Sequence, residues 1–543
     1  MAHVCPCTVR EYVLRELRCG NCAPAPKGRG ILSTATICIS VTIVVYLACV
    51  LGIGFYFAKK NEDTSDFYLG GRKLGPLVTA MSAEASDMSS YLLMGLPGLA
   101  YLSGIADVGW TVIGLAVGTY LNWLFTARRL RRYTHLTGSI TLPQFFSNRY
   151  HDKRNILAAI SAVIILVFFI PYTASGFAAC GKLFSSLFGI DYGVAMVVSA
   201  IVIVGYTAAG GFLAASTTDF LQSIIMTFAI LFVLGFATAS AGGPGAVLEN
   251  ARALPGYLSM TQTHLESGEA APYTALTIVS TLAWGLGYFG MPHILLRFMA
   301  IEDENKLKLS RRVASVWVVI AMAVAVLVGV VGSALSAAGL IETLSGPASE
   351  TVIIRIADLL SQFGILPALA AGLILSGILA STMSTADSQL LAASSSVSQD
   401  LLGSFFHLQL SEKASMLAAR GTVVVIAVLG VVIARDPNSS IFGIVSFAWA
   451  GFGAGFGPLI LCSLFWKRTT LAGAVAGMTA GGVAVFAWKY LLKPMGGVFG
   501  IYELLPAFLV GLAVIVVVSL LTPAPEQVIL DEFEQAAGAK EIA

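Results

Sequence analysis

Long apolar segments alternate with short polar connections along almost the whole 543-residue chain. A helix that crosses a bilayer needs about 20 mostly apolar residues. Read on this criterion, the pattern predicts an all-α integral membrane protein with about 13 transmembrane helices. The predicted windows are 33–58, 76–101, 108–127, 155–180, 191–209, 212–240, 274–292, 313–340, 363–394, 420–434, 441–465, 470–490 and 503–521.

Two of these windows carry interruptions typical of broken helices. Window 76–101 contains the polar run 86–90, and window 274–292 contains three closely spaced glycines and ends at Pro292. Backbone groups freed at such breaks must be buried in protein or line a wet cavity, because lipid cannot satisfy them. Two broken segments five windows apart predict a LeuT-like inverted five-plus-five-helix repeat, with its first and sixth core helices broken. We expect the two core repeats at about 76–240 and 274–465.

The composition agrees with a membrane protein and excludes several other classes. Hydrophobic residues make up 57% of the chain and charged residues 11%, against about 45–50% and about 25% in soluble domains. Lys and Arg number 32 against 30 Asp and Glu, so no basic surplus is present to bind nucleic acid. The predicted organisation is a polar N-terminal tail (1–32), one transporter bundle in membrane lipid (33–521) and a polar C-terminal tail (522–543).

Charge placement predicts how the bundle is oriented. With the N-terminus outside and the C-terminus cytoplasmic, 21 Lys and Arg, including Arg297, fall on the inner side and 6 on the outer side. The positive-inside rule favours this orientation in the cell membrane, although five positive charges in the tail point the other way. The tail also holds Cys5, Cys7, Cys19 and Cys22. Their spacing is compatible with a zinc site, but the segment could also be a disordered tail, or its start codon could have been assigned too early.

Polar residues at membrane depth are the main candidates for function. Asp87, Asp219, Asp387 and Glu84 lie inside apolar windows, where a charge costs roughly 2.5–3.5 kcal/mol on insertion scales. Each carboxylate could simply cap a broken helix or pair with an arginine. The serines around Asp87 favour a cation site there.

A stripe of hydroxyls lies on the window that also holds Asp387. Ser381, Ser384, Thr385 and Ser388 follow the i, i+3, i+4, i+7 spacing of one helix face. Any one of them could bond only to a carbonyl of its own helix. Together, with carbonyls released by an unwound helix, they offer the uncharged oxygens that suit a sodium ion.

Aromatic residues flank both predicted breaks and could enclose a small apolar or cationic group. They are Tyr91, Tyr172, Trp284 and Tyr288.

Several longer motifs resemble the solute:sodium symporter family, and within it the members that carry proline. The likeness runs from about residue 55 to about residue 520 and implies a thirteen-helix inverted-repeat transporter. The motifs are Ser86-Asp87-Met88-Ser89, Leu93-Met94-Gly95-Leu96-Pro97-Gly98, Gly210-Gly211-Phe212-Leu213-Ala214, Trp284-Gly285-Leu286-Gly287-Tyr288-Phe289-Gly290, Pro292-His293-Ile294-Leu295, Arg297-Phe298-Met299-Ala300 and Met383-Ser384-Thr385.

The resemblance implies roles for particular residues of this chain. The implied sodium ligands are Ala85, Met88, Ser381, Ser384 and Thr385, with Asp87, Ser89 and Asp219 supporting them. Arg72 corresponds to an arginine important for coupling. The implied proline pocket consists of Tyr91, Tyr172, Trp284, Tyr288 and Pro292. Tyr91, Met291 and Glu84 stand where the family has tryptophan, glutamine and glycine, so they bear on the identity and affinity of the substrate.

The sequence therefore predicts sodium-coupled symport of L-proline, with sodium as the coupling ion and no enzymatic chemistry. A symporter for another small amino acid or a monocarboxylate is the first alternative, because pocket residues differ. The remote alternative is an intramembrane hydrolase using Asp87 and Asp219, or Ser384. The sequence disfavours a hydrolase, since it has no Gly-x-Gly-Asp or Gly-x-Ser-Gly stretch and no histidine close to Ser384.

Overall fold

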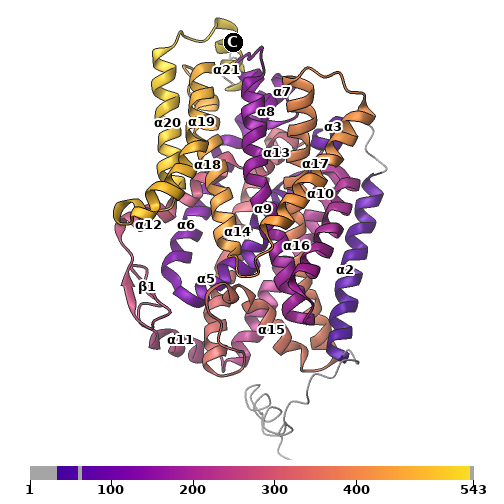
Figure 1. The fold of residues 1–543 in the computed structure, drawn as a ribbon, viewed down its shortest axis with the longest axis vertical. Coiled ribbons are helices and arrows are strands. Elements are labelled where there is room, and N and C mark those ends of the chain that lie inside the picture. The colour runs from indigo at the N-terminus through magenta and orange to yellow at the C-terminus, as the bar shows by residue number, and fades with distance from the viewer. Residues whose placement is uncertain (1–32, 59–63, 539–543) are drawn as a thin grey trace, which may run out of the picture.

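The chain folds into a tall bundle of helices that run mainly along one axis (Figure 1). The computed structural model describes residues 33–58 and 64–538, so the cysteine-containing tail falls outside the described residues. Within those residues, ten helices are long and apolar enough to cross a membrane. Apolar side chains such as Val44, Phe228 and Leu366 remain 62%, 64% and 77% exposed on the outside of the bundle, as lipid-facing residues are.

The first half of the chain contains one leading helix and then the first broken segment. Its helices are α2 (Thr34–Ala58), α3 (Thr64–Leu69), η1 (Gly70–Arg72), α4 (Pro76–Ser90), η2 (Tyr91–Gly95), α5 (Leu96–Ser103), α6 (Ile105–Leu121), η3 (Asn122–Thr126), α7 (Ala127–Leu136), α8 (Leu142–Arg149), α9 (Ile156–Phe188), α10 (Tyr192–Ser240) and α11 (Pro244–Ala253).

The second half begins after a small antiparallel hairpin of β1 (Gln262–His264) and β2 (Ala270–Pro272). Its helices are α12 (Ala275–Leu282), η4 (Ala283–Gly290), α13 (Pro292–Ala300), η5 (Glu304–Lys306), α14 (Leu307–Ala337), η6 (Gly346–Thr351), α15 (Val352–Ser361), α16 (Ile365–Ser395), η7 (Ser396–Phe405), α17 (Glu412–Ile433), α18 (Ile441–Phe465), α19 (Leu471–Ala487), η8 (Trp488–Leu492), η9 (Lys493–Met495), η10 (Gly497–Gly500), α20 (Leu504–Leu521) and α21 (Gln527–Ala536).

Every predicted window coincides with helix, but several boundaries differ. The windows 191–209 and 212–240 both lie in α10, where a kink at Gly211, with φ 72° and ψ −175°, divides the 49 residues into two helical segments. Glycine takes that conformation without steric cost. Window 274–292 continues past Pro292 as α13, which ends at Ala300. The number of thirteen crossings stays a prediction.

The broken segments lie at the centre of the bundle. Every residue of α4 from Thr79 to Ser90 is buried, and so is every residue of α13. Helices approach closely here because glycines remove side chains: a Cβ at Gly285 would collide with the backbone of Gly114, and one at Gly287 with the indole of Trp449. Small residues permit such close packing of membrane helices.

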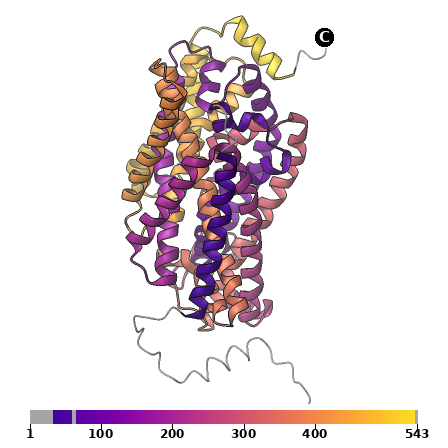
Figure 2. The same cartoon turned by 90° about the vertical axis from the view of Figure 1, so that its right-hand side faces the viewer.

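The two ends of the bundle differ in their covering elements. Figure 1 places α3, α7, α8 and α21 at one end and α11, α15 and the hairpin at the other. Figure 2 shows the C-terminal helix α21 lying obliquely across its end of the bundle. There Phe533 of α21 is buried, and the guanidinium of Arg149 lies 5.2 Å from its ring centroid.

Candidate functional site

The polar run of the first broken helix ends in an unusual backbone conformation. Ser89 has φ 45° and ψ −168° inside the otherwise helical stretch, a conformation that costs a non-glycine residue about 1–3 kcal/mol. Its side-chain oxygen accepts a hydrogen bond of 3.1 Å from the backbone N–H of Tyr91, which partly replaces the helical bonding. The predicted break of the first core helix is therefore present, next to Asp87 and Met88.

The second predicted break has a different form. The glycine-rich stretch of η4 is a tight 3-10 helix, and Met291 then takes an extended conformation with φ −77° and ψ 108°. Pro292 is the first residue of α13. A proline is tolerated there because the N–H of a first helical residue has no partner within the helix. Met291 itself is fully buried at this joint. The two broken segments are linked, because the Tyr288 hydroxyl of η4 donates a 2.6 Å hydrogen bond to Oδ2 of Asp87.

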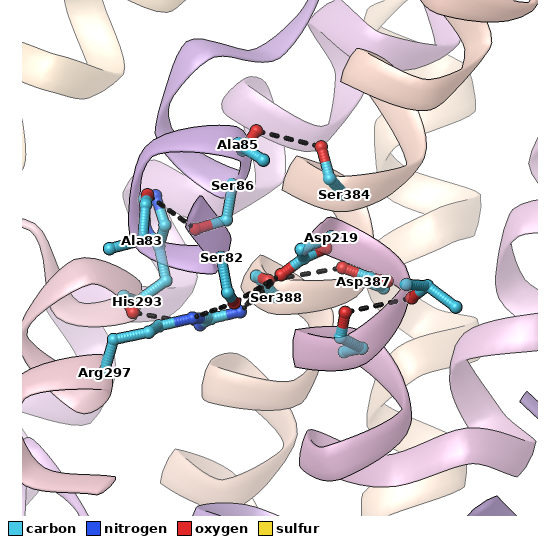
Figure 3. Close-up of polar contacts among 12 residues, drawn as sticks. Ser82, Ala83, Ala85, Ser86, Asp219, His293, Arg297, Ser384, Asp387 and Ser388 are labelled. Carbon is cyan, nitrogen blue, oxygen red and sulfur yellow. Dashed lines mark hydrogen bonds and ion pairs between the residues drawn. The ribbon is translucent and has the colours of Figure 1, made fainter. Parts of the chain in front are cut away.

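Four of the five predicted sodium ligands come together between α4 and α16. The Ser384 hydroxyl donates to the carbonyl oxygen of Ala85 at 2.9 Å and contacts the carbonyl oxygen of Ser381 at 3.2 Å (Figure 3). The Thr385 hydroxyl donates to the same Ser381 carbonyl at 3.1 Å. The carbonyl of the fifth residue, Met88, accepts from the backbone N–H of Tyr91 at the break.

This arrangement gathers two carbonyls and two hydroxyls in a buried place. Ser381, Ser384 and Ala85 are completely buried, and Thr385 is 3% exposed. All four oxygens are uncharged and belong to two helices that touch directly. A sodium ion accepts such hard oxygen ligands, so the residues fit the ion that the sequence predicts.

The other hydroxyls of α16 divide between two roles. Ser376 and Thr382 donate to the carbonyls of Gly372 and Ile378 in their own helix, the local bonding that is common in membrane helices. Ser388, predicted to share the stripe of Ser384, instead contacts Asp387 and Arg297.

Asp219 lies in a separate buried ion pair with Arg297, which is the arginine pairing that the sequence left open as an alternative. Its Oδ2 accepts a hydrogen bond of 3.0 Å from Nη2 of Arg297 and another of 2.7 Å from the Ser82 hydroxyl. Arg297 also donates to Ser82 at 3.0 Å and to Ser388 at 2.5 Å, which brings α4, α10, α13 and α16 together (Figure 3). The guanidinium stands 5.0 Å from the ring centroid of Phe212.

The placement of Arg297 in a cytoplasmic loop is therefore wrong. The residue is 1% exposed in α13. The sequence reading ended the helix at Pro292, but a proline at the first position begins a helix as easily as it ends one. Its motif, which includes Arg297-Phe298-Met299-Ala300, was the signal that pointed to a structural role.

Asp87 and Glu84 face different partners. The Asp87 carboxylate accepts the hydrogen bond from Tyr288 described above. Its backbone carbonyl accepts a second hydrogen bond, of 3.2 Å, from the Tyr172 hydroxyl. Glu84 accepts a 2.9 Å hydrogen bond from the indole N–H of Trp123 in η3. Both carboxylates keep one oxygen without a hydrogen bond among the described residues. Asp87 thus joins the predicted sodium helix to two residues of the predicted substrate pocket.

Trp284 lies at the centre of an aromatic cluster. Of the other predicted pocket aromatics, Tyr91 stacks on it and Tyr288 joins through Trp449, whereas the ring of Tyr172 lies near that of His293. Tyr91 stacks on Trp284 with ring centroids 5.8 Å apart and an interplanar angle of 28°. Tyr502 lies 5.0 Å from Trp284 at 20°, also stacked. Phe442 lies 5.4 Å from Trp284 and 5.6 Å from Tyr91.

Three members of this aromatic cluster were missed by the sequence reading: Phe442, Trp449 and Tyr502. Trp449 lies 5.1 Å from Tyr288 in an edge-to-face contact, and its indole donates to the carbonyl of Trp284 at 2.8 Å. Phe442 and Trp449 come from α18, and Tyr502 precedes α20, outside both predicted core repeats. No local pattern marks Tyr502, because its contact with Trp284 depends on how distant helices pack.

At the end that carries the hairpin, a buried ion pair ties three segments together. Lys182 of α9 donates to Glu350 of η6 at 2.6 Å and to the carbonyl of Ser439 at 2.8 Å. Glu350 also accepts from the Ser440 hydroxyl and from the backbone N–H of Phe442. This pair therefore connects η6 to the start of α18, where Phe442 belongs to the aromatic cluster.

At the opposite end, Arg72 binds three backbone carbonyls. It donates to Thr134 at 2.9 Å, to Ser139 at 2.7 Å and to Met299 at 2.7 Å. Burial, followed by the positive charge of Arg131, lowers the pKa of Arg72 to about 10, so the guanidinium is still protonated at neutral pH. Arg72 thus fastens η1 to the ends of α7 and α13.

Comparisons with known proteins agree with this architecture. The model of the sodium:solute symporter family matches residues 67–481. The sodium/proline symporter of Haemophilus influenzae is 43% identical over 506 residues, covering 92% of this chain and 97% of that protein. A Staphylococcus aureus sodium/proline symporter is 42% identical over 493 residues, covering 89% of this chain and 93% of that protein.

Two solved structures share the fold at lower identity. A Na⁺-coupled sialic acid symporter in an outward-open state superposes with a TM-score of 0.73 at 18% identity, covering 90% of this chain and 99% of that one. The nucleobase-cation-symport-1 family transporter Mhp1 superposes with a TM-score of 0.54 at 14% identity, covering 87% of this chain and 98% of that one.

The fold is thus that of a LeuT-like, multi-pass membrane transporter, as predicted from the broken windows. The chain belongs to the sodium:solute symporter family, because the family model matches most of its length and close relatives cover nearly all of it.

Proposed function

We propose that this protein couples the entry of sodium to the uptake of L-proline across the cell membrane by alternating access. Relatives that are 42–43% identical over about nine tenths of the chain are sodium/proline symporters, which supports this substrate and this ion. The observation that carries the proposal is the bond from Ser384 on α16 to the Ala85 carbonyl on broken α4. A sodium ion held by these oxygens would link the helix that breaks to the helix that it packs against.

Coupling follows from where the two sites meet. Asp87 lies two residues after Ala85, just before the break, and is hydrogen-bonded to Tyr288 and Tyr172 of the proposed substrate pocket. Sodium that orders this stretch of α4 would also order the groups that receive proline. Linkage then requires that proline tighten sodium binding by the same factor. The rings around Trp284 would hold the pyrrolidine and its ammonium group.

The two ends of the bundle supply the closures that alternating access needs. Lys182 with Glu350 closes the end with the hairpin, and Arg72 with its three carbonyls closes the end with α21. In the proposed orientation the hairpin end is extracellular, and the end with α21 and the C-terminus is cytoplasmic. Each closure would open in turn while the other remains bonded.

No observation favours a hydrolase. The carboxylates of Asp87 and Asp219 have different partners, Tyr288 for one and Arg297 with Ser82 for the other, so they do not form a dyad. Ser384 donates its hydroxyl to backbone carbonyls instead of a base. A sodium symporter for another small amino acid or a monocarboxylate remains the alternative, because Tyr91, Glu84 and Met291 differ from the family pattern.

The test is uptake of labelled L-proline into proteoliposomes that contain the purified protein. An inward sodium gradient is compared with an equal potassium gradient and with a proton gradient, and unlabelled alanine and lactate are added as competitors. We expect only sodium to drive accumulation and only unlabelled proline to compete strongly. Uptake that ignores sodium, or that lactate or alanine blocks better than proline, would contradict the proposal.

A further inference from the structure

Among the buried tyrosines of the proposed pocket and of the adjoining aromatic cluster, one differs from the others in its hydrogen bonding. The hydroxyl of Tyr172 donates to the Asp87 carbonyl, that of Tyr288 to the Asp87 carboxylate and that of Tyr502 to the Ser446 carbonyl, at 3.2, 2.6 and 2.6 Å. The hydroxyl of Tyr91 is buried and has no hydrogen-bond partner among the described residues. The whole residue is only 4% exposed.

Leaving this hydroxyl unpaired is unfavourable. A buried polar group without a partner costs about 1–3 kcal/mol, and phenylalanine would fill the same space without that cost. The ring cannot easily turn to find a bond elsewhere, because Trp284 stacks on it and Phe442 packs 5.6 Å away. A group that is held in place, buried and unpaired is suited to a partner that arrives from outside the chain.

The position of Tyr91 indicates which ligand brings that partner. Its backbone N–H is bonded to Ser89 at the break of α4, and its ring lies against Trp284 of the proposed pocket. A substrate held there by its ammonium and carboxylate groups would present its ring to the aromatic side chains. Apart from its ammonium nitrogen and Cα, the ring of proline consists of CH₂ groups, and these cannot form a hydrogen bond with a hydroxyl.

We infer that the Tyr91 hydroxyl binds a hydrogen-bonding substituent on the pyrrolidine ring, so that hydroxylated prolines are substrates along with proline. This inference rests on the proposed function and adds to it the class of ring-substituted substrates. The other unpaired oxygens nearby, on Asp87 and Glu84, accept hydrogen bonds or attract cations. The phenolic hydroxyl both donates and accepts, which matches an alcohol.

The experiment compares ligands within one protein, so that differences in the amount of folded protein cancel. Competition against labelled L-proline is measured for unlabelled L-proline, cis-4-hydroxy-L-proline and trans-4-hydroxy-L-proline, in saturating sodium, for the wild type, Tyr91→Phe and Tyr91→Trp. Tyr490→Phe is the matched control, because Tyr490 is 60% exposed and lies outside the proposed pocket. Thermal unfolding of each purified variant verifies its folding.

We expect Tyr91→Phe to weaken at least one hydroxyproline isomer by roughly five- to tenfold more than it weakens L-proline, because only the hydroxyl is removed and the ring stays. Tyr91→Trp should lose the same discrimination, and Tyr490→Phe should retain it. The same ratio of proline to hydroxyproline affinity in all four proteins would overturn the inference, since the hydroxyl would then bind only water. Loss of L-proline binding in both Tyr91 variants, with intact folding, would also contradict it. Absence of sodium-dependent proline binding in the wild type would instead refute the proposed function.

Discussion

Ser384 on α16 donates its hydroxyl hydrogen bond to the carbonyl oxygen of Ala85, 2.9 Å away on the broken helix α4. The two residues are 299 positions apart in the sequence, so this contact depends on the packing of the two predicted repeats. Backbone carbonyls of a membrane helix are normally used by the helix itself. Here one of them faces a hydroxyl of another helix, where a cation of the right size can take both oxygens.

Removing the charge of Asp87 should nearly abolish transport. Its carboxylate accepts the 2.6 Å bond from Tyr288, and hydrogen bonds to a charged group are worth about 1.5–3 kcal/mol. We expect Asp87→Asn to reduce the initial rate of sodium-driven proline uptake at least roughly tenfold.

Glu84→Gln is the control for Asp87→Asn. A glutamine can still accept the indole N–H of Trp123 that Glu84 accepts at 2.9 Å, so uptake should stay within about threefold of wild type. Normal sodium dependence and rate in Asp87→Asn would show that the charge has no part in transport.

The buried pair of Arg297 and Asp219 should be important for stability. Arg297 is 1% exposed and Asp219 is completely buried, and breaking such a pair from one side costs about 3–5 kcal/mol. Asp219→Asn or Arg297→Met should therefore lower the melting temperature of the protein in detergent markedly. The double variant should be less destabilised than the sum of the two, because neither charge is then left alone.

The exposed pair of Lys306 and Glu302 offers a matched comparison. Its atoms are 2.7 Å apart, closer than those of the buried pair, but the two side chains are 47% and 40% exposed. Pairs of this kind contribute at most about 1 kcal/mol. We expect Lys306→Met to lower the melting temperature much less than Arg297→Met does. Equal decreases would show that burial does not explain the contribution of the Arg297–Asp219 pair to stability.

Arg72→Lys should uncouple sodium from proline while the protein still folds. Lysine keeps the charge, but a single ammonium cannot reproduce the planar guanidinium that reaches the carbonyls of Thr134, Ser139 and Met299. We expect the variant to carry sodium in the absence of proline, which is measured as ²²Na⁺ uptake into proteoliposomes.

Titration of Arg72 should not contribute to any pH dependence in the ordinary range. With a pKa of about 10, this guanidinium is protonated both at pH 6 and at pH 8. A coupling ratio in Arg72→Lys equal to that of the wild type would remove Arg72 from the account of coupling.

Much of the site could be predicted from the chain, because membrane depth makes polar residues stand out. Ser384, Thr385 and Asp87 interrupt apolar windows, and lipid imposes a cost on each. The broken helices were visible for the same reason. Arg297 was misplaced because the predicted window ends at Pro292, whereas α13 begins at this proline, continues to Ala300 and buries the arginine against Asp219.

The aromatic cluster was predictable only in part. Tyr91, Trp284 and Tyr288 lie next to the breaks, so their positions in the sequence indicated their role. Tyr502 reaches Trp284 from beyond the core repeats, and periodicity carries no information about packing between distant helices. The proposed role of the Ala85 carbonyl was likewise implied only by the family resemblance, because every residue has a carbonyl.

The sodium dependence of proline binding in a protein that carries both Ser384→Ala and Thr385→Ala tests the central claim most directly. The change removes both hydroxyl oxygens and leaves the carbonyls of Ala85 and Ser381. Ser376→Ala is the control, because that hydroxyl bonds only to its own helix at Gly372. We predict that the half-saturating sodium concentration rises at least roughly tenfold in the double variant and is unchanged in the control. A double variant that saturates at the wild-type sodium concentration would contradict the assignment of this site.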